Sequence, residues 1–245
     1  MLIRSLVAAV GGILALVVLV ALAVLVTGPD RGGPRTPVDR DSPPPAAAPL
    51  PDGTDPVAWA AATAPGADVP ERTLRAYANA ELRQRELTPQ CRVGWATLAG
   101  IGRIESRHGT LGDAQVRADG RVEPPVVGIP LDGTDGTRLV TDTDGGVLDG
   151  DPDLDRAVGP MQFLPETWQR YGADGNDDGV ADPHQIDDAA LAAAGYLCGG
   201  DRDVTEAEDW WDGVLAYNAS GSYARDVWSA AADYAARTAP DEAAR

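Results

Sequence analysis

The stretch from residue 110 to residue 157 is rich in Gly, Asp and Pro, and its few apolar residues follow no regular spacing. On both sides of it, apolar residues recur at the spacing of helices. One such helix follows Pro70 and carries Leu74, Tyr77, Ala78 and Leu82 on one face. Further helices are expected over Trp95–Arg107, Glu166–Tyr171, Asp187–Leu197, Trp210–Tyr217 and Tyr223–Ala236. The pattern predicts a mainly α fold, a single helical domain over residues 69–238 with a long irregular insertion that has room for short strands.

An unbroken apolar run, Leu6–Val26, lies near the N-terminus. As a helix it would be about 30 Å long, the thickness of the hydrocarbon core of a bilayer. We therefore expect a transmembrane anchor over residues 1–27. A cleaved signal peptide with Ala21-Leu22-Ala23 as its cleavage site is the alternative, and the anchor is favoured because the apolar run continues past that site. Either way, the rest of the chain is expected to be exported.

Residues 28–68 are rich in Pro and Ala and poor in large apolar side chains, which predicts a disordered, semi-extended linker. A short polar tail is expected over residues 239–245. The formal net charge of −18 argues against a nucleic-acid partner, because such binding depends on basic groups that neutralise phosphates.

The sequence contains two cysteines, Cys91 and Cys198. In an exported chain such a pair suggests a disulfide, and two buried free thiols are the alternative. Zinc is disfavoured, because neither of the two histidines lies at ligand spacing from a cysteine.

One carboxylate stands out, in the segment LAGIGRIESRHG (98–109). On a helix, Glu105 shares a face with Leu98, Ile101 and Gly102. A glutamate on an apolar face is desolvated, so its pKa rises and it can serve as a general acid near neutral pH. The alternative is a glutamate that reaches solvent or pairs with His108.

Three separated segments then resemble a known family. IGRIESRHG (101–109), AVGPMQFLPETWQRYG (157–172) and LAYNASGSYARDV (215–227) are similar, in this order, to the MltB-type lytic murein transglycosylases. The resemblance covers about residues 70–236. It implies an α+β lysozyme-like fold and, with the anchor and the linker, the membrane-anchored actinobacterial branch of the family.

The resemblance also implies roles for individual residues. Glu105 would be the single catalytic acid and base. The segment 159–163 would form a wall of the sugar groove, and the motif that begins at Tyr217 would line the site. The substrate-binding set implied in this way is Ser106, Met161, Gln162, Phe163, Tyr217, Asn218 and Tyr223.

The implied reaction needs one carboxylate. Glu105 would protonate the glycosidic oxygen between N-acetylmuramic acid and N-acetylglucosamine, and would then take the proton of the muramoyl C6 hydroxyl, giving a 1,6-anhydro product. A hydrolytic muramidase would need a second carboxylate, for which Asp149, Asp151 or Asp155 is available. A catalytically silent peptidoglycan-binding protein on the same fold is a further alternative.

The segment DGNDDGVAD (174–182) follows the pattern of a calcium loop. Gln185 stands where such a loop has its last, bidentate glutamate, and the family's longer loop points to Asp188 instead, with Asp187 as the neighbour in doubt. The expected ligands of a structural Ca²⁺ are Asp174, Asn176, Asp178, the Val180 carbonyl, Asp182 and Asp188. The acidic run Asp142–Asp155 lacks the glycine pattern, so we interpret it as solvated turns, with a metal site or a rim of the sugar groove as alternatives.

These features together predict an enzyme that needs no cofactor for its chemistry. It would be a monomer held at the cell membrane by a single span, with its catalytic domain outside the cytoplasm facing peptidoglycan. A secreted protein is the alternative.

Overall fold

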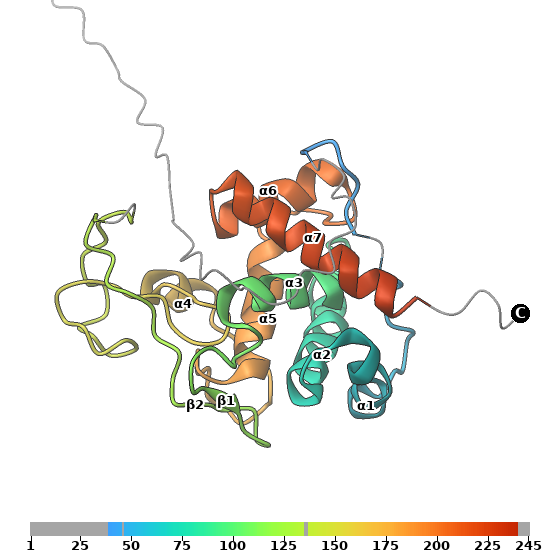
Figure 1. Ribbon diagram of the computed structural model, residues 1–245, viewed down its shortest axis with the longest axis horizontal. Coiled ribbons are helices and arrows are strands. Elements are labelled where there is room, and N and C mark those ends of the chain that lie inside the picture. The colour runs from blue at the N-terminus through green and yellow to red at the C-terminus, as the bar shows by residue number, and fades with distance from the viewer. Residues whose placement is uncertain (1–38, 46, 135–136, 240–245) are drawn as a thin grey trace, which may run out of the picture.

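The computed structural model describes residues 39–45, 47–134 and 137–239. This part of the chain is predominantly helical (Figure 1). Its helices are α1 (Pro56–Ala67), α2 (Glu71–Leu87), α3 (Trp95–Ser106), α4 (Pro165–Tyr171), α5 (Ile186–Leu197), α6 (Ala207–Tyr217) and α7 (Gly221–Arg237). Two short strands, β1 (Gln115–Val116) and β2 (Val122–Glu123), form an antiparallel pair. The predicted mainly α fold and each of the predicted helices are confirmed.

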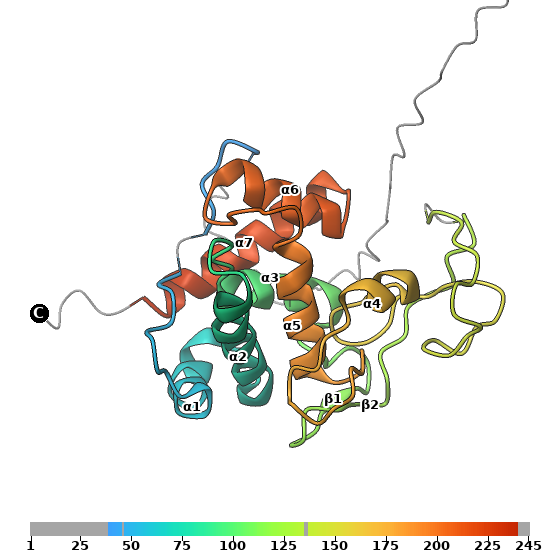
Figure 2. The same ribbon diagram turned by 180° about the vertical axis from the view of Figure 1, so that it is seen from behind.

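Helix α3 lies in the middle of the helical body, where α7 and α2 pack against it (Figures 1 and 2). The side chains of Leu98 and Ile101 are fully buried in this core. Gly100 allows α7 to approach closely, because a Cβ at this position would lie 2.8 Å from the Val227 carbonyl oxygen. The core therefore fixes α3, the helix that carries Glu105, from two sides.

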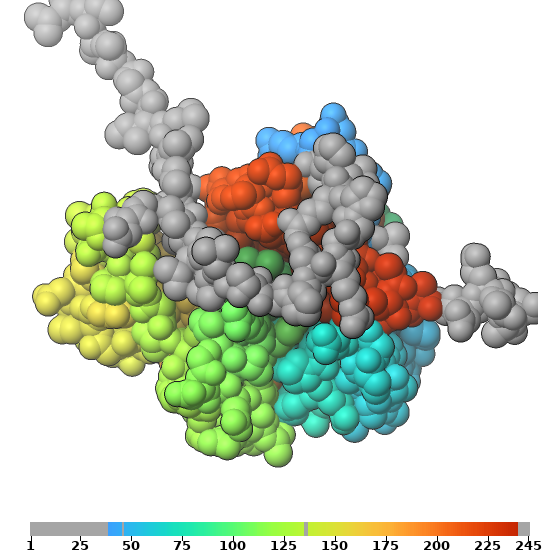
Figure 3. All heavy atoms as spheres, viewed as in Figure 1, coloured from blue at the N-terminus to red at the C-terminus, as the bar shows by residue number. Residues whose placement is uncertain are grey.

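The insertion leaves the helical body as a loop-rich lobe (Figures 1 and 3). Beyond β1 and β2 it contains only isolated antiparallel bridges, such as Thr141↔Leu154. Its aspartates stabilise its turns: the Asp142 carboxylate accepts hydrogen bonds from the backbone N–H groups of Gly145 and Gly146. The predicted irregular insertion with short strands is confirmed.

The predicted disordered linker over residues 28–68 is wrong in its C-terminal part. Pro56–Ala67 is a helix, whose N-cap Asp55 accepts a hydrogen bond from the Val57 N–H. The preceding segment is also packed: Leu50 is buried, and its N–H donates to the buried Glu81 carboxylate over 2.7 Å. Composition alone predicts disorder here, but one cap and a few apolar contacts suffice to order an Ala- and Pro-rich segment.

Most of the two chain ends lies outside the residues that the structure describes. The predicted anchor over residues 1–27 falls outside the described residues, as does all of the predicted tail except residue 239. No helix in the described part of the chain has the length and apolar character needed to cross a bilayer.

The predicted disulfide is formed between Cys91 and Cys198, 107 residues apart in sequence. Neither cysteine is a free thiol. Cys91 lies in the turn before α3 and Cys198 caps the end of α5. The bond therefore links these two helices covalently at the edge of the core.

Candidate functional site

Glu105 lies in the last turn of α3, which ends at Ser106. The helix face predicted to be apolar is buried, with Leu98 and Ile101 fully enclosed, and Glu105 at its end is half-buried. Gly102 leaves room for a neighbouring helix, because a Cβ there would overlap the hydroxyl group of Tyr77 on α2. The glycines of α3 thus let neighbouring helices reach the base of the site.

The environment of Glu105 favours its neutral form. Burial raises the pKa of its carboxyl from 4.5 to about 7. The Tyr223 hydroxyl donates a hydrogen bond of 2.6 Å to Oε1, which stabilises the charged form and offsets part of this rise. Among the described residues, no neighbouring carboxylate contributes to the shift. Glu105 therefore has the protonation behaviour of a general acid that acts near neutral pH.

Contacts between side chains and backbone bring the three predicted motifs together around Glu105. Tyr223 comes from α7, while Tyr217 is the last residue of α6. The Tyr217 hydroxyl donates to the Met161 carbonyl oxygen over 2.7 Å, and its ring lies edge-on to Phe163. The predicted neighbourhood of the ES, GPMQF and AYN…Y segments is thus present in the structure.

Exposure separates the predicted substrate-binding residues into two groups. Gln162 and Tyr217 are half-buried, so they lie where a ligand can reach them. The others lie beneath the surface, with exposed fractions below 10%: Ser106, Met161, Phe163, Asn218 and Tyr223. In this structure these five buried residues support the exposed part of the site.

Ser106 shows what such support consists of. Its hydroxyl donates to the Pro160 carbonyl oxygen over 2.6 Å and accepts from the Gly109 N–H. It therefore fastens the end of α3 to the segment that carries Gln162. The Gln162 amide in turn donates to the Gly159 carbonyl oxygen over 2.9 Å, and the Asn218 side-chain oxygen accepts from the Ser220 N–H.

Sequence reasoning missed a buried group beside the site. His108 does not pair with Glu105, as one alternative held. Its ring lies between the hydroxyl groups of Tyr77 and Tyr234. These residues stand 31 and 126 positions from His108, so no local pattern signals the contacts.

The predicted calcium loop is closed by its own oxygen atoms. Both carboxylate oxygens of Asp174 and the side-chain amide oxygen of Asn176 accept backbone N–H groups of the loop, at Asp178 and Gly179. Gly179 has the positive φ, +88°, that the turn requires. Hard oxygen donors on a tight acidic loop are the kind that Ca²⁺ prefers, although in this structure these oxygen atoms accept backbone N–H groups.

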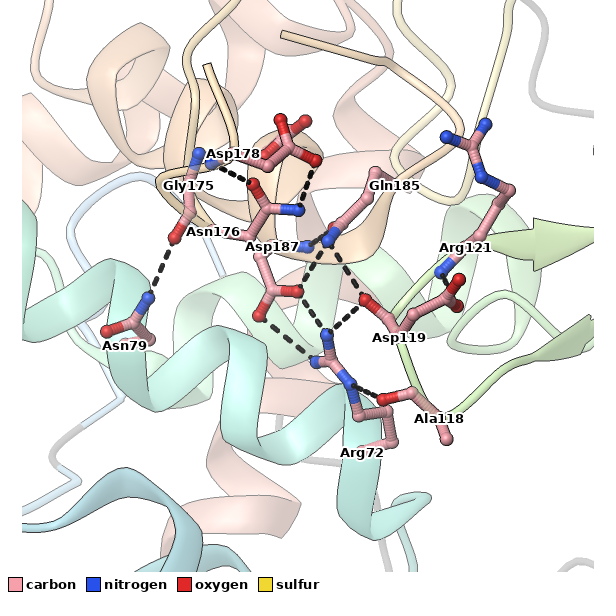
Figure 4. A network of polar contacts seen from close by, with 11 residues as sticks. Arg72, Asn79, Ala118, Asp119, Arg121, Gly175, Asn176, Asp178, Gln185 and Asp187 are labelled. Carbon is pink, nitrogen blue, oxygen red and sulfur yellow. Dashed lines mark hydrogen bonds and ion pairs between the residues drawn. The ribbon is translucent and has the colours of Figure 1, made fainter. Parts of the chain in front are cut away.

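The structure distinguishes the two aspartates that open α5. Asp188 is buried and faces the loop, where its carboxylate accepts from the N–H groups of Gly175 and Asp182. Asp187 points the other way and forms an ion pair with Arg72 on α2, seen in Figure 4. Asp188 is thus the better-placed last ligand.

The other two predicted ligands are Asp182 and Val180, and both have contacts or exposure that draw them away from the loop. The Asp182 carboxylate is bound to Arg121 at 2.7 Å and also accepts from the His184 N–H. Val180 carries an exposed side chain, and its N–H donates to the Asp178 carboxylate. The side-chain oxygen atoms that face the loop are those of Asp174, Asn176, Asp178 and Asp188.

The acidic residues of the insertion serve mainly its own turns. Three carboxylate oxygens lie within 4.8 Å of one another, one each from Asp142, Asp144 and Asp155. However, Asp142 and Asp144 accept backbone N–H groups, and the buried Asp155 accepts from both the N–H and the hydroxyl of Thr143. These contacts agree with the interpretation as acidic turns.

Two further carboxylates were considered as partners of Glu105 in a hydrolase. Asp151 is bound to the Arg156 guanidinium over 2.8 Å, and Asp149 accepts from the Arg156 N–H. Both are therefore engaged within the insertion.

Known proteins resemble this chain in part. Residues 155–210 match the family model described as the transglycosylase SLT domain. This range includes the 159–163 segment and the calcium-type loop, and it ends before α7. The match confirms the resemblance to SLT-type transglycosylases predicted from the motifs.

The solved structures include the crystal structure of SltB3 from Pseudomonas aeruginosa in complex with NAG-anhNAM-pentapeptide. It shares 16% sequence identity and covers 74% of this chain and 67% of its own, with a TM-score of 0.38. A likeness at this level carries no conclusion about this chain. No curated protein matches the sequence.

Proposed function

We propose that this chain, which carries a transglycosylase SLT domain over residues 155–210, is a lytic transglycosylase of peptidoglycan. It cleaves the β-1,4 bond between N-acetylmuramic acid and N-acetylglucosamine and forms a 1,6-anhydro end. The observation that carries the proposal is the environment of Glu105. This carboxyl has a pKa of about 7, and the Tyr223 hydroxyl holds it at the meeting point of the three motifs.

In the first step the protonated Glu105 donates its proton to the glycosidic oxygen, and the bond from that oxygen to C1 of the muramoyl residue breaks. The carboxylate that remains is stabilised by the Tyr223 hydroxyl. In the second step this carboxylate accepts the proton of the muramoyl C6 hydroxyl, whose oxygen bonds to C1. The proton that Glu105 gave up is thus restored, and no water is consumed.

The contacts of the candidate second carboxylates favour this reaction over hydrolysis. A glycoside hydrolase places its two carboxyl groups about 5 to 9.5 Å apart. Asp149, Asp151 and Asp155 are instead bound within the insertion.

A silent glycan-binding protein is the second alternative. Such a protein gains nothing from a desolvated carboxyl with a pKa near neutrality. The Glu105–Tyr223 contact therefore favours an enzyme.

The cellular setting belongs to the same proposal. The catalytic domain acts outside the cytoplasm on glycan strands as a monomer, held by the apolar run Leu6–Val26 as a membrane anchor. A structural Ca²⁺ bound by the 174–188 loop supports α5 and takes no part in the chemistry.

The test uses Glu105→Gln, with Glu166→Gln as a matched control because Glu166 is an exposed acid on α4. Purified peptidoglycan is digested with each protein, and the soluble muropeptides are identified by mass spectrometry. We expect anhydromuropeptides from the wild type and from Glu166→Gln, and none from Glu105→Gln. Substantial release by folded Glu105→Gln would overturn the proposal.

A further inference from the structure

A chain of buried hydrogen bonds lies behind the turn that follows Glu105, and the reaction described above does not use it. His108 Nδ1 lies 3.1 Å from the Tyr77 hydroxyl oxygen, and Nε2 lies 2.8 Å from the Tyr234 hydroxyl oxygen. All three side chains are at least 94% buried. Tyr77 belongs to α2 and Tyr234 to α7, so the ring bridges two helices that both pack against α3.

The backbone of this turn is strained. Arg107 and His108 have φ values of 52° and 65°, in the left-handed region, and Gly109 follows with 81°. A non-glycine residue in this region is unfavourable and persists only where its surroundings enforce it. The turn closes α3 directly after Glu105, with the His108 N–H bonded to the Gly102 carbonyl oxygen over 2.8 Å.

The contacts of His108 supply this enforcement. Besides the two ring contacts, its carbonyl oxygen accepts a hydrogen bond from the Thr73 hydroxyl on α2. The residue is therefore held from α2 through both its backbone and its ring, and from α7 through its ring.

The His108 ring stays neutral over the pH range in which the enzyme would act. The titratable and charged groups that face it are Tyr77 from α2, Tyr234 from α7 and Arg103 from α3. Burial, with a contribution from Arg103, lowers the pKa of His108 to about 3, while burial raises the pKa of both tyrosines. A neutral imidazole has one donor and one acceptor, which suits two hydroxyl partners.

We propose that His108 is a positioning residue: it holds the strained turn at the end of α3 and thereby keeps the Glu105 carboxyl on the Tyr223 hydroxyl. It touches no reacting atom and acts through the backbone that joins it to Glu105. The inference rests on the proposed function, since it assigns to His108 an effect on the acid of that reaction.

The test replaces His108 in two ways. His108→Leu removes the ring nitrogen partner of both tyrosine hydroxyls. His108→Asn is the conservative variant, because asparagine tolerates a positive φ and its amide offers a donor and an acceptor. For each folded protein, kcat, KM and the pH profile of kcat are measured on peptidoglycan.

We expect kcat of His108→Leu to fall about tenfold or more, because a small misplacement of a catalytic group has effects of this size. KM should stay within about threefold, as for an interaction that serves the transition state. The alkaline limb of the profile should move to higher pH, because Glu105 loses part of its contact with Tyr223. His108→Asn should recover part of both effects.

A matched control is Thr97→Val, on the same helix. It removes a buried hydrogen bond of 3.1 Å from Trp210 to the Thr97 hydroxyl, about two turns before Glu105. We expect it to lower the melting temperature without moving the alkaline limb. If His108→Leu behaves like this control, with unchanged kcat and limb, the inference is overturned.

Two milder variants keep the test decisive if His108→Leu does not fold. Tyr77→Phe and Tyr234→Phe each remove one hydroxyl partner, and a change of kcat with a shifted limb is again the supporting result. Unchanged values in both would overturn the inference. An active Glu105→Gln protein would instead overturn the proposed function, so the two failures are distinguishable.

Discussion

At the scale of single residues, the account depends on the ionisation of Glu105. The same burial that suits its carboxyl to donate a proton makes the charged form unfavourable in the folded protein. The folded state binds this proton more tightly than the unfolded state does. Stability should therefore fall as the pH rises from about 4.5 to about 7, and the full penalty should be present above pH 7.

Glu105→Gln should remove this penalty. A rise of the pKa from 4.5 to about 7 corresponds to at most about 3–4 kcal/mol. We expect the variant to melt a few degrees above the wild type at pH 8 and at nearly the same temperature at pH 4. Calorimetry across this range checks the prediction, and a difference that does not grow with pH would contradict it.

The Tyr223 hydroxyl acts in the opposite direction on the same carboxyl. Because its hydrogen bond stabilises the charged form, Tyr223→Phe should raise the pKa of Glu105 further and move the alkaline limb of kcat to higher pH. We expect kcat to fall about tenfold, as for the loss of a hydrogen bond to a charged group.

Tyr196→Phe is the control for this change. It removes a hydroxyl that donates to the Ala216 carbonyl oxygen and makes no contact with Glu105. If the alkaline limb of kcat does not move in Tyr223→Phe, or moves equally in both variants, the role assigned to the Tyr223 hydroxyl is contradicted.

At the scale of elements, helices with an apolar period could be predicted and their contacts could not. The faces of α2 and α3 follow from spacing alone. By contrast, α1 escaped prediction because its Ala-rich sequence has little amphipathic contrast, although Asp55 before Pro56 is a visible cap signal. The reason for Gly102 depends on Tyr77, which another helix supplies.

For the candidate site, too, the sequence predicts segments but not the contacts between distant parts of the chain. Glu105 and the three motifs could be found from the sequence, partly through a resemblance. The Tyr77–His108–Tyr234 contacts join α2 and α7 to the turn after α3, and only the tertiary fold reveals them.

The loop at 174–188 allows a test of the proposed ion. We expect Ca²⁺ to raise the melting temperature of the wild type and EGTA to reverse the effect, because a ligand that binds only the folded state stabilises it. Asp178→Asn should abolish the response. Asp144→Asn, in the acidic insertion, should retain it, and loss of the response in that variant alone would place the ion elsewhere.

At the scale of the whole molecule, the disulfide joins two distant parts of the helical body. The bond Cys91–Cys198 encloses α3, the insertion, α4 and α5 in one covalent loop. Every predicted site residue up to Asp188 lies inside this loop, whereas α6 and α7 pack on it from outside. The bond therefore constrains the part of the chain that carries Glu105.

Reduction should lower the free energy of unfolding by up to about 4–5 kcal/mol, the entropy of closing a loop of this length. The chain has only these two cysteines, so a reductant acts on this bond alone. Melting curves with and without a phosphine reductant check the prediction. An unchanged melting temperature with both thiols shown to be free would contradict it.

In the proposed reaction one carboxylate, Glu105, cleaves the glycan without consuming water. The most direct measurement is digestion of defined peptidoglycan strands in water enriched in ¹⁸O, followed by mass spectrometry of the muramic ends. The account predicts 1,6-anhydro ends that contain no ¹⁸O, because the C6 oxygen of the substrate closes the bond to C1. Reducing muramic ends labelled with ¹⁸O would contradict it and would identify a hydrolase.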